Sequence, residues 1–206
     1  MDRQQIVAEA VALLDAEGLE GVTQRKLAAH LGIAQPTLYW HLPNKAALVT
    51  AIADEILAQG LPGLAPPAPG QPWPDWLASF AGALRQALLA HPDGARVVSV
   101  SQTSRAMAAA SELAITSLTQ SGVDLRQARL IVLTVERFTF GHVLEEQAPR
   151  PAPGDIDLPD LTRQFPNLVA SIADYFRDGG TADDVFRDCL GIVIAGAAAA
   201  ASRPAP

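Results

Sequence analysis

The sequence contains a single cysteine, Cys189, which excludes an intrachain disulfide and a cysteine zinc site. Its neighbours are apolar, so we expect the thiol to be buried rather than reactive. Long hydrophobic runs are also missing, because the most apolar stretch, residues 189–201, is mostly alanine and too short to cross a bilayer. The first ten residues carry charges and no apolar signal core. We therefore expect a cytoplasmic protein with no membrane partner.

Positive charge is scarce as well. The chain has 15 lysines and arginines against 22 aspartates and glutamates, and its formal net charge is −7. This net negative charge argues against a protein that covers nucleic acid nonspecifically through its overall charge. It leaves room for a local DNA-contacting face, provided that folding brings together the few basic residues of the N-terminal part. These are Arg3, Arg25, Lys26 and Lys45.

Groupings typical of catalytic sites are absent from the sequence. There is no Ser-His-Asp grouping, no phosphate-binding loop and no H-x-x-x-H pair. The four histidines, His30, His41, His91 and His142, are widely scattered. We expect a protein that is not an enzyme and that carries no metal and no other cofactor.

Alternating strand patterns, repeats and heptad runs are missing too, and almost every segment has a helical pattern. The hydrophobic content of 49% is enough for a real core. Capping residues, glycines and prolines mark where each N-terminal helix starts and stops. The four predicted helices are residues 2–18, ending at Gly18; 23–32, from Thr23 to Gly32; 35–42, with Pro36 in the first turn and Pro43 after it; and 44–60, from Asn44 to Gly60.

Residues 61–74 contain six prolines and read as a linker. They separate an N-terminal unit of residues 1–60 from a C-terminal unit of residues 61–206. The second unit is again helical, with helices predicted at residues 74–91, 103–122, 124–147, 160–176 and 181–201. The helix at 124–147 is apolar nearly all round and should be central. Thr181 and Asp184 form a start that is similar to a capping box. The expected fold is therefore all-α.

Two short helices joined by a tight turn and packed on a first helix make a helix-turn-helix. Five aliphatic residues can face one small core: Leu27, Leu31, Ile33, Leu38 and Leu42. With Leu38 pointing inward, its neighbours Gln35, Thr37, Tyr39, Trp40 and His41 remain for the outside or its margins. In a small helical unit, however, either Tyr39 or Trp40 could instead pack inward.

This set of side chains suits DNA. Glutamine can pair with adenine through two hydrogen bonds, and proline, tyrosine or tryptophan can contact a thymine methyl group. Threonine, histidine and lysine can bind phosphates. Lys45 opens the next helix, whose N-terminal amides also favour a phosphate. Arg25 could reach a guanine, or it could be a solvated charge.

Residues 18–57 also match the pattern of a known family. They read GLEGVTQRKLAAHLGIAQPTLYWHLPNKAALVTAIADEIL and resemble the DNA-binding domain of the tetracycline repressor (TetR) family. The likeness continues more weakly through residues 83–97 and 137–147. It implies an all-helical homodimer with a C-terminal dimer interface and an internal ligand pocket. It also implies a repressor that binds a palindromic operator with two recognition helices and is released when an inducer moves the linking helix, residues 44–60.

The resemblance further implies roles for individual residues. Arg25 and Gln35 would read base edges. Gln24 stands where tetracycline-binding members have a second threonine, and we keep it among the DNA-binding candidates. The remaining candidates divide into Pro36, Thr37, Tyr39 and Trp40, which would contact bases or backbone, and Thr23, His41 and Lys45, which would hold phosphates.

The implied drug pocket has changed. Tetracycline-binding members have a metal-coordinating histidine where this chain has Val98. They also have a drug-contacting histidine at the end of the linking helix, where this chain has Gly60 and Leu61. An asparagine and a phenylalanine are replaced by Phe80 and Leu84, while the glutamate that binds the water of the metal is kept as Glu145. One acidic residue does not make a magnesium site. We therefore predict that the chain does not bind tetracycline with magnesium.

Because these changes run from polar to apolar, we expect a largely apolar organic effector. The predicted pocket is lined by Phe80, Leu84, Val98, Leu113 and Phe138, with polar points at Ser101, Arg137, His142 and Glu145. Some of these residues could equally be core, Leu84 and Val98 above all. His142 and Arg137 could instead serve an interface or an ion pair. A helical protein that sequesters small molecules and has a vestigial DNA face is the alternative function.

Overall fold

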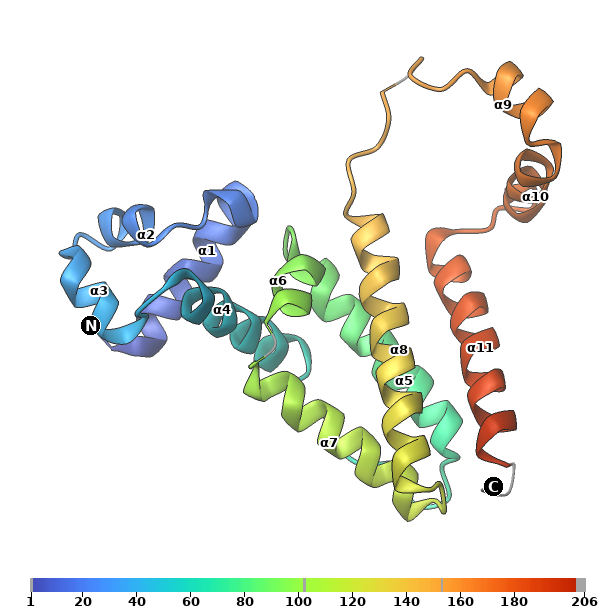
Figure 1. Cartoon of the computed structure of the whole chain (residues 1–206), viewed down its shortest axis with the longest axis horizontal. Helices are drawn as coiled ribbons and strands as arrows, with labels where there is room; N and C mark the ends of the chain where they lie inside the picture. The colour runs from blue at the N-terminus through green and yellow to red at the C-terminus, as the bar shows by residue number, and fades with distance from the viewer. Residues whose placement is uncertain (1, 102, 153, 203–206) are drawn as a thin grey trace.

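The computed structural model describes residues 2–101, 103–152 and 154–202, and within these ranges the protein is all-α (Figure 1). The predicted fold class is confirmed. The outer ends of the two predicted domains, residues 1 and 203–206, lie outside the described residues. The helices are α1 (Arg3–Gly21), α2 (Gln24–His30), α3 (Gln35–His41), α4 (Lys45–Gly60), α5 (Trp73–Leu89), α6 (Gly94–Val100), α7 (Arg105–Gln120), α8 (Leu125–Glu146), α9 (Leu158–Gln164), α10 (Pro166–Phe176) and α11 (Ala182–Ala201).

Side-chain caps start α2 and α4 where the sequence predicts them. The Thr23 hydroxyl accepts a hydrogen bond from the Lys26 amide, and the Asn44 side chain accepts one from the Ala47 amide. Gly18 has a φ of 67° and breaks the regular part of α1, but one further turn follows before the helix ends at Gly21. α3 begins after Ala34 without a side-chain cap and has Pro36 in its first turn.

The helix-turn-helix has the aliphatic core that the sequence predicts. Leu27, Leu38 and Leu42 are buried, and Leu31 and Ile33 are packed against them at its edge. Since α3 has only two turns, one inward-facing leucine is enough to seat it. The rest of α3 therefore faces away from the core.

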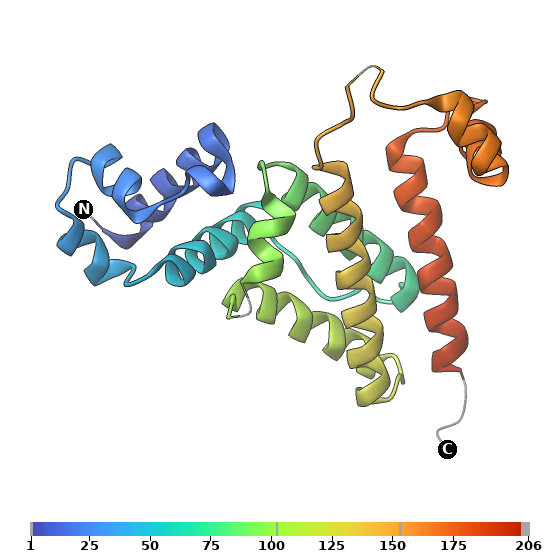
Figure 2. The ribbon, with the colours of Figure 1, turned by 45° about the horizontal axis from the view of Figure 1, so that its top comes forward.

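α4 connects the two halves of the molecule. It packs on α1 on one side and on α5, α6 and α7 on the other, and it runs from the helix-turn-helix into the larger helical body (Figures 1 and 2). Its last residue, Gly60, lies directly on α5. A Cβ added at Gly60 would fall 2.2 Å from the Ala87 Cβ. The two helix backbones thus meet at this point.

This contact gives a direct stability prediction. Gly60→Ala should destabilise the fold by about 1–3 kcal/mol, the usual effect of overpacking, although alanine is the better helix former. The matched control is Gly82→Ala on α5, where an added Cβ meets no atom within 4 Å. Urea unfolding should show a lower midpoint for the first variant and an equal or higher midpoint for the second. Equal losses in both would contradict the close approach of α4 and α5.

The C-terminal body is built on α5, α8 and α11, which lie side by side, with α7 packed against α8 and α4 (Figures 1 and 2). α8 buries one face, including Ile131 and Val135, and exposes leucines on the other. It is therefore less enclosed than its apolar sequence suggests. Cys189 of α11 is only half-buried, so the expectation of a buried thiol is wrong.

Two local predictions also need correction. The single helix expected at residues 160–176 is two helices, because Pro166 lacks an N–H and its ring disfavours a helical conformation at Phe165. α6 was not expected at all. The expected linker, residues 61–74, does lack helix up to Pro72, and it is tied to α5 by the Trp76 indole, which donates to the Ala65 carbonyl at 3.0 Å.

The segment of α9 and α10 stands apart from the rest of the body and joins the end of α8 to the start of α11 (Figures 1 and 2). Neither helix buries a residue, and several large apolar side chains on them are exposed. Among the described helices, none has the length and apolar character to cross a membrane.

Candidate nucleic-acid interface and effector site

α3 presents an exposed surface at one end of the molecule. Leu38 is fully buried beneath it, whereas Tyr39 and Trp40 are 44% and 88% exposed. Gln35 and Thr37 are exposed as well, and so is Pro36 in the first turn. Neither aromatic ring packs inward, so the fold does not require their size or flatness.

Basic groups flank this surface. Arg25 at the start of α2 and Lys45 at the start of α4 are both exposed, and within the described residues neither forms an ion pair. His41 at the end of α3 is half-buried. The Thr23 side chain caps α2, which holds that hydroxyl close to the start of the helix. α2 and α4, the helices before and after α3 in the chain, therefore each carry an exposed cationic group in their first turn.

Gln24 has a different position from the other candidates. Its side-chain amide donates to the Leu42 carbonyl at 2.6 Å, and this bond ties the start of α2 to the end of α3. The same amide cannot point freely away from the domain. Gln24 thus holds the two helices at a fixed angle, a role that sequence reasoning missed.

Polar contacts fix the helix-turn-helix to the body. The Asp93 carboxylate accepts a hydrogen bond from the Leu19 amide at 2.8 Å, and the His91 ring lies 2.7 Å from the Asp15 carboxylate. Asp93 sits at a φ of 56°, a left-handed conformation that is uncommon for any residue other than glycine.

A second contact comes from α4. There the Asp54 carboxylate accepts hydrogen bonds from the Ser104 hydroxyl, at 2.6 Å, and from the Ala106 amide, at 3.0 Å. Asp54 thereby caps the start of α7 and binds it to the linking helix. A displacement of α6 or α7 would therefore be transmitted to α1 and α4 through these hydrogen bonds.

The predicted effector residues do not surround one cavity. Phe80, Leu84 and Val98 are buried in the core. Ser101 is buried too, donates its hydroxyl hydrogen to the Val97 carbonyl, and borders a cavity of about 390 Å³ next to α4. Leu113 borders a different cavity of about 290 Å³ between α4 and α7.

The remaining effector candidates lie on the C-terminal half of α8. His142 and Glu145 border a third cavity, of about 410 Å³. Phe138 is half-buried and packs on Phe186 of α11, with the two ring centroids 5.6 Å apart. Arg137 is exposed on the same helix. His142 also packs on Phe186, with 5.1 Å between centroids, so this ring is held by aromatic neighbours.

The region near the predicted drug-contacting position is tightly filled. The space next to Gly60 is taken by Ala87, and no side chain fits there without movement of α5. Within the described residues, no three His, Cys, Asp or Glu side chains lie close enough together to hold a metal ion.

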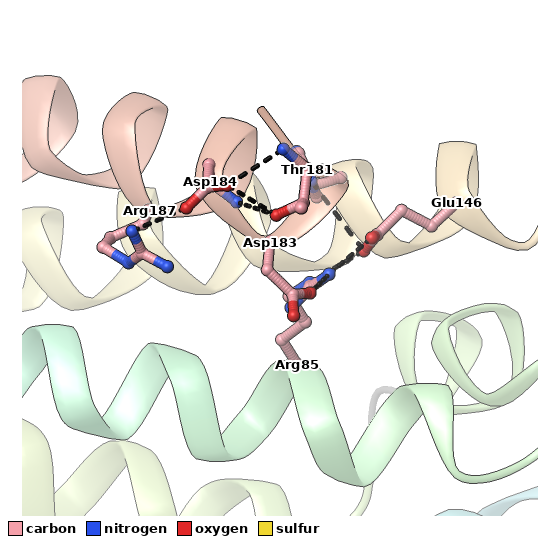
Figure 3. Close-up of polar contacts among 7 residues, drawn as sticks. Arg85, Glu146, Thr181, Asp183, Asp184 and Arg187 are labelled. Carbon is pink, nitrogen blue, oxygen red and sulfur yellow. Dashed lines mark hydrogen bonds and ion pairs between the residues drawn. The ribbon is translucent and has the colours of Figure 1, made fainter. Parts of the chain in front are cut away.

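Sequence reasoning missed an ionic cluster around a buried arginine in the body, which Figure 3 shows in close-up. Arg85 of α5 is only 4% exposed. Its Nε and Nη2 donate to the two Glu146 oxygens at 2.8 and 2.6 Å, and Nη2 also donates to Asp183 at 2.7 Å. The Phe186 ring lies beneath the guanidinium, 4.9 Å away. Hydrogen bonding to Glu146 raises the pKa of Arg85, so this group is a permanent cation.

A second buried charged residue lies between α7 and α8. Glu136 is 5% exposed, and its Oε1 accepts a hydrogen bond from the Ser111 hydroxyl at 2.5 Å. Burial raises the pKa of this carboxyl above its ordinary value, while the Ser111 bond works in the opposite direction. For Arg85 the sequence did offer a signal, a cation among the mostly apolar residues of α5. Glu136 had no such signal, because it is one of several charged residues on α8.

A two-turn helix with one buried anchor and an exposed polar and aromatic surface, carried on a helical body with cavities, defines a helix-turn-helix regulator of transcription. Two family profiles match the chain. Residues 6–52 match "Bacterial regulatory proteins, tetR family", and residues 66–201 match "Tetracyclin repressor-like, C-terminal domain". The chain therefore belongs to the TetR family and is a ligand-responsive transcriptional regulator.

Similarities to individual proteins and solved structures support the same family assignment. The chain is 39% identical over 177 residues to the tetracycline repressor protein class D of Escherichia coli, covering 83% of this chain and 81% of that protein. A variant of TetR from Acinetobacter baumannii AYE, solved in complex with minocycline, has a TM-score of 0.76 and 31% identity, with 98% and 99% coverage. BioQ bound to its double-stranded DNA operator has a TM-score of 0.69 and 27% identity, with 97% and 99% coverage.

Proposed function

We propose that the chain is a cytoplasmic transcriptional repressor that binds a palindromic operator as a homodimer and is released by a small, largely apolar organic effector other than tetracycline with magnesium. The observation that carries this proposal is the exposed surface of α3, where Trp40 is 88% exposed above a fully buried Leu38. Relatives that are named tetracycline repressors support the repressor role, and the operator complex of BioQ supports the DNA target.

In this proposal α3 is the recognition helix and lies in the major groove. Gln35 and Arg25 read base edges, since Gln pairs with adenine and Arg with guanine. Tyr39 and Trp40 contact thymine methyl groups or the sugar-phosphate backbone, together with Pro36 and Thr37. His41, Lys45 and the Thr23 hydroxyl hold phosphates, while Gln24 keeps α2 and α3 in position through the Leu42 carbonyl.

The proposed dimer uses the outer faces of α8 and α11. Leu130 and Leu144 on α8 and Ile192 on α11 are exposed in the single chain, and Ile192 is 75% exposed. Two such helices from each copy can form a four-helix bundle that buries these side chains. The bundle would place two α3 helices on the same side of the DNA, as a palindrome requires.

The replaced pocket residues support an effector other than tetracycline with magnesium. Val98 offers no ligand to a metal, and the region around Gly60 has no room for a histidine. Glu145 is exposed on α8, and a single carboxylate cannot supply an octahedral magnesium site. An uncharged organic molecule fits these surroundings better.

The test is capture of genomic fragments by the purified protein, followed by release. We expect a small set of fragments to be retained and then released by some neutral, apolar compounds, while tetracycline with magnesium leaves the complex intact at concentrations that release a tetracycline repressor. Retention of no fragment would contradict the DNA-binding part of the proposal, and release by tetracycline with magnesium would contradict the effector part.

A further inference from the structure

A cavity of about 480 Å³ lies between α5 and α11, on a side of α5 different from the core-facing side of Phe80 and Leu84. We call it the α5–α11 cavity. Its volume is within the range of small-molecule sites. Its lining includes Gly82, Arg85 and Gln86 from α5, and Phe186, Arg187 and Gly191 from α11.

Two glycines in helix interiors face this cavity. Glycine destabilises a helix relative to alanine, so an interior glycine usually has a packing reason. Gly60 has such a reason, because Ala87 fills the place of its side chain. At Gly82 and Gly191 an added Cβ would meet no atom within 4 Å. Gly141 of α8 and Gly196 of α11 are equally open and lie outside this lining, so open space alone does not mark a site. Gly82 and Gly191 differ from them because they face the same cavity from opposite walls, where a larger side chain would take up its volume.

The walls of the cavity are apolar and its polar groups are few. Ala78, Leu190 and Ile194 line it together with the Phe186 ring. The exposed Gln86 amide and the exposed Arg187 guanidinium offer N–H donors (Figure 3 shows Arg187). This combination suits a flat apolar body with a hydrogen-bond acceptor at one end.

The charges of the lining favour a neutral ligand. Two cations, Arg85 and Arg187, and two carboxylates, Asp75 and Asp183, line the cavity. Arg85 is already satisfied by Asp183 and by Glu146 behind it, and Arg187 is paired with Asp184 at 2.8 Å. An ionic ligand would add an unbalanced charge to a partly desolvated site, which is unfavourable.

We propose that the α5–α11 cavity binds a neutral, flat, largely apolar organic molecule that carries a hydrogen-bond acceptor, and that it is the effector site of the regulator. This inference rests on the proposed function and names its ligand site. The physical link to DNA binding is short. Gln86 lines the cavity, and the next residue, Ala87, lies against Gly60 at the end of α4. A ligand that displaces α5 therefore acts directly on the linking helix.

The test uses Nile red, a neutral planar dye with a ring carbonyl whose fluorescence reports an apolar site. Gly82→Leu and Gly191→Leu each place an aliphatic side chain in the cavity from opposite walls. Ser79→Leu is the matched control, because Ser79 is exposed on α5 outside the lining and gains a side chain of the same size. Dye titration, sedimentation velocity and operator affinity are measured for the full-length chain and each variant.

We expect saturable dye binding by the unaltered chain and by Ser79→Leu. Binding should weaken on the order of tenfold or more in both glycine variants, because the added side chain takes the volume of the ligand. The dye should also lower operator affinity in the unaltered chain. Unchanged dye binding in both glycine variants would overturn the site, and bound dye without effect on operator affinity would overturn its role as effector site.

A second copy of the chain is the competing occupant. If the glycine variants lose dye binding only because they change from dimer to monomer, the cavity is a face between copies and the proposal fails. Absence of operator binding by the unaltered chain would instead refute the proposed function, and the dye titration would still decide whether the cavity binds a ligand.

Discussion

Gln35→Ala is expected to weaken operator binding by about 2–6 kcal/mol. A two-bond contact to a base contributes about 1–3 kcal/mol of discrimination, and a homodimer loses that contact in both half-sites. Gln35 is exposed at the start of α3, so its removal leaves the fold unchanged. The loss should be much smaller on a DNA fragment without the operator, where phosphate contacts dominate.

Fluorescence anisotropy with labelled operator measures this difference. Gln120→Ala is the control, since Gln120 is an exposed glutamine at the end of α7, far along the chain from α3. It should bind the operator within twofold of the unaltered protein. If the Gln35 and Gln120 variants bind equally well, α3 is not the helix that reads the bases.

Arg85→Ala is expected to destabilise the protein by about 3–5 kcal/mol. Arg85 is 4% exposed and is the cation between Glu146 and Asp183. Its removal leaves the Glu146 carboxylate, which is 17% exposed, without a compensating charge, and this costs more than the intact pair stabilises. Asp183 is 68% exposed, so solvent screens its charge and its part in the loss is small. The Phe186 ring would lose its contact with the guanidinium as well.

Urea unfolding followed by circular dichroism measures the change. Arg177→Ala is the matched control, because Arg177 and its partner Asp174 are about two-thirds exposed and a surface pair contributes little. Its unfolding midpoint should stay close to that of the unaltered chain. Similar midpoints for both variants would show that the ionic cluster does not hold α5, α8 and α11 together.

Local features of the fold could be predicted from the sequence because they depend on neighbouring residues. The caps at Thr23 and Asn44 and the capping box of Thr181 with Asp184 form where their residue types indicate. The break before Pro166 was predictable by the same logic and was missed, because the apolar period continues across it. α6 was not predicted, because its N-cap Asp93 has a left-handed conformation and accepts a hydrogen bond from the distant Leu19 amide, which neighbouring residues do not indicate.

The DNA-binding surface of α3 and the effector site also differ in how far they depend on neighbouring residues in the sequence. α3 is one short helix, so placing Leu38 inward also settles which of its neighbours face outward. The effector site depends on contacts that are distant in sequence. Arg85 meets Asp183 across 98 residues, and Gly60 meets Ala87 across two helices. Helix periodicity predicts that Phe80 and Leu84 are buried or line a pocket, but it does not tell which elements oppose them.

The most direct measurement is a nuclease footprint of the purified protein on a captured genomic fragment at low salt. The proposed function predicts two protected half-sites of a palindrome, with centres about one helical turn or a small multiple apart, one for the α3 of each copy. Both half-sites should lose protection together in the Gln35→Ala variant. An unprotected fragment at low salt, or a single protected half-site, would contradict a dimeric regulator that reads DNA through α3.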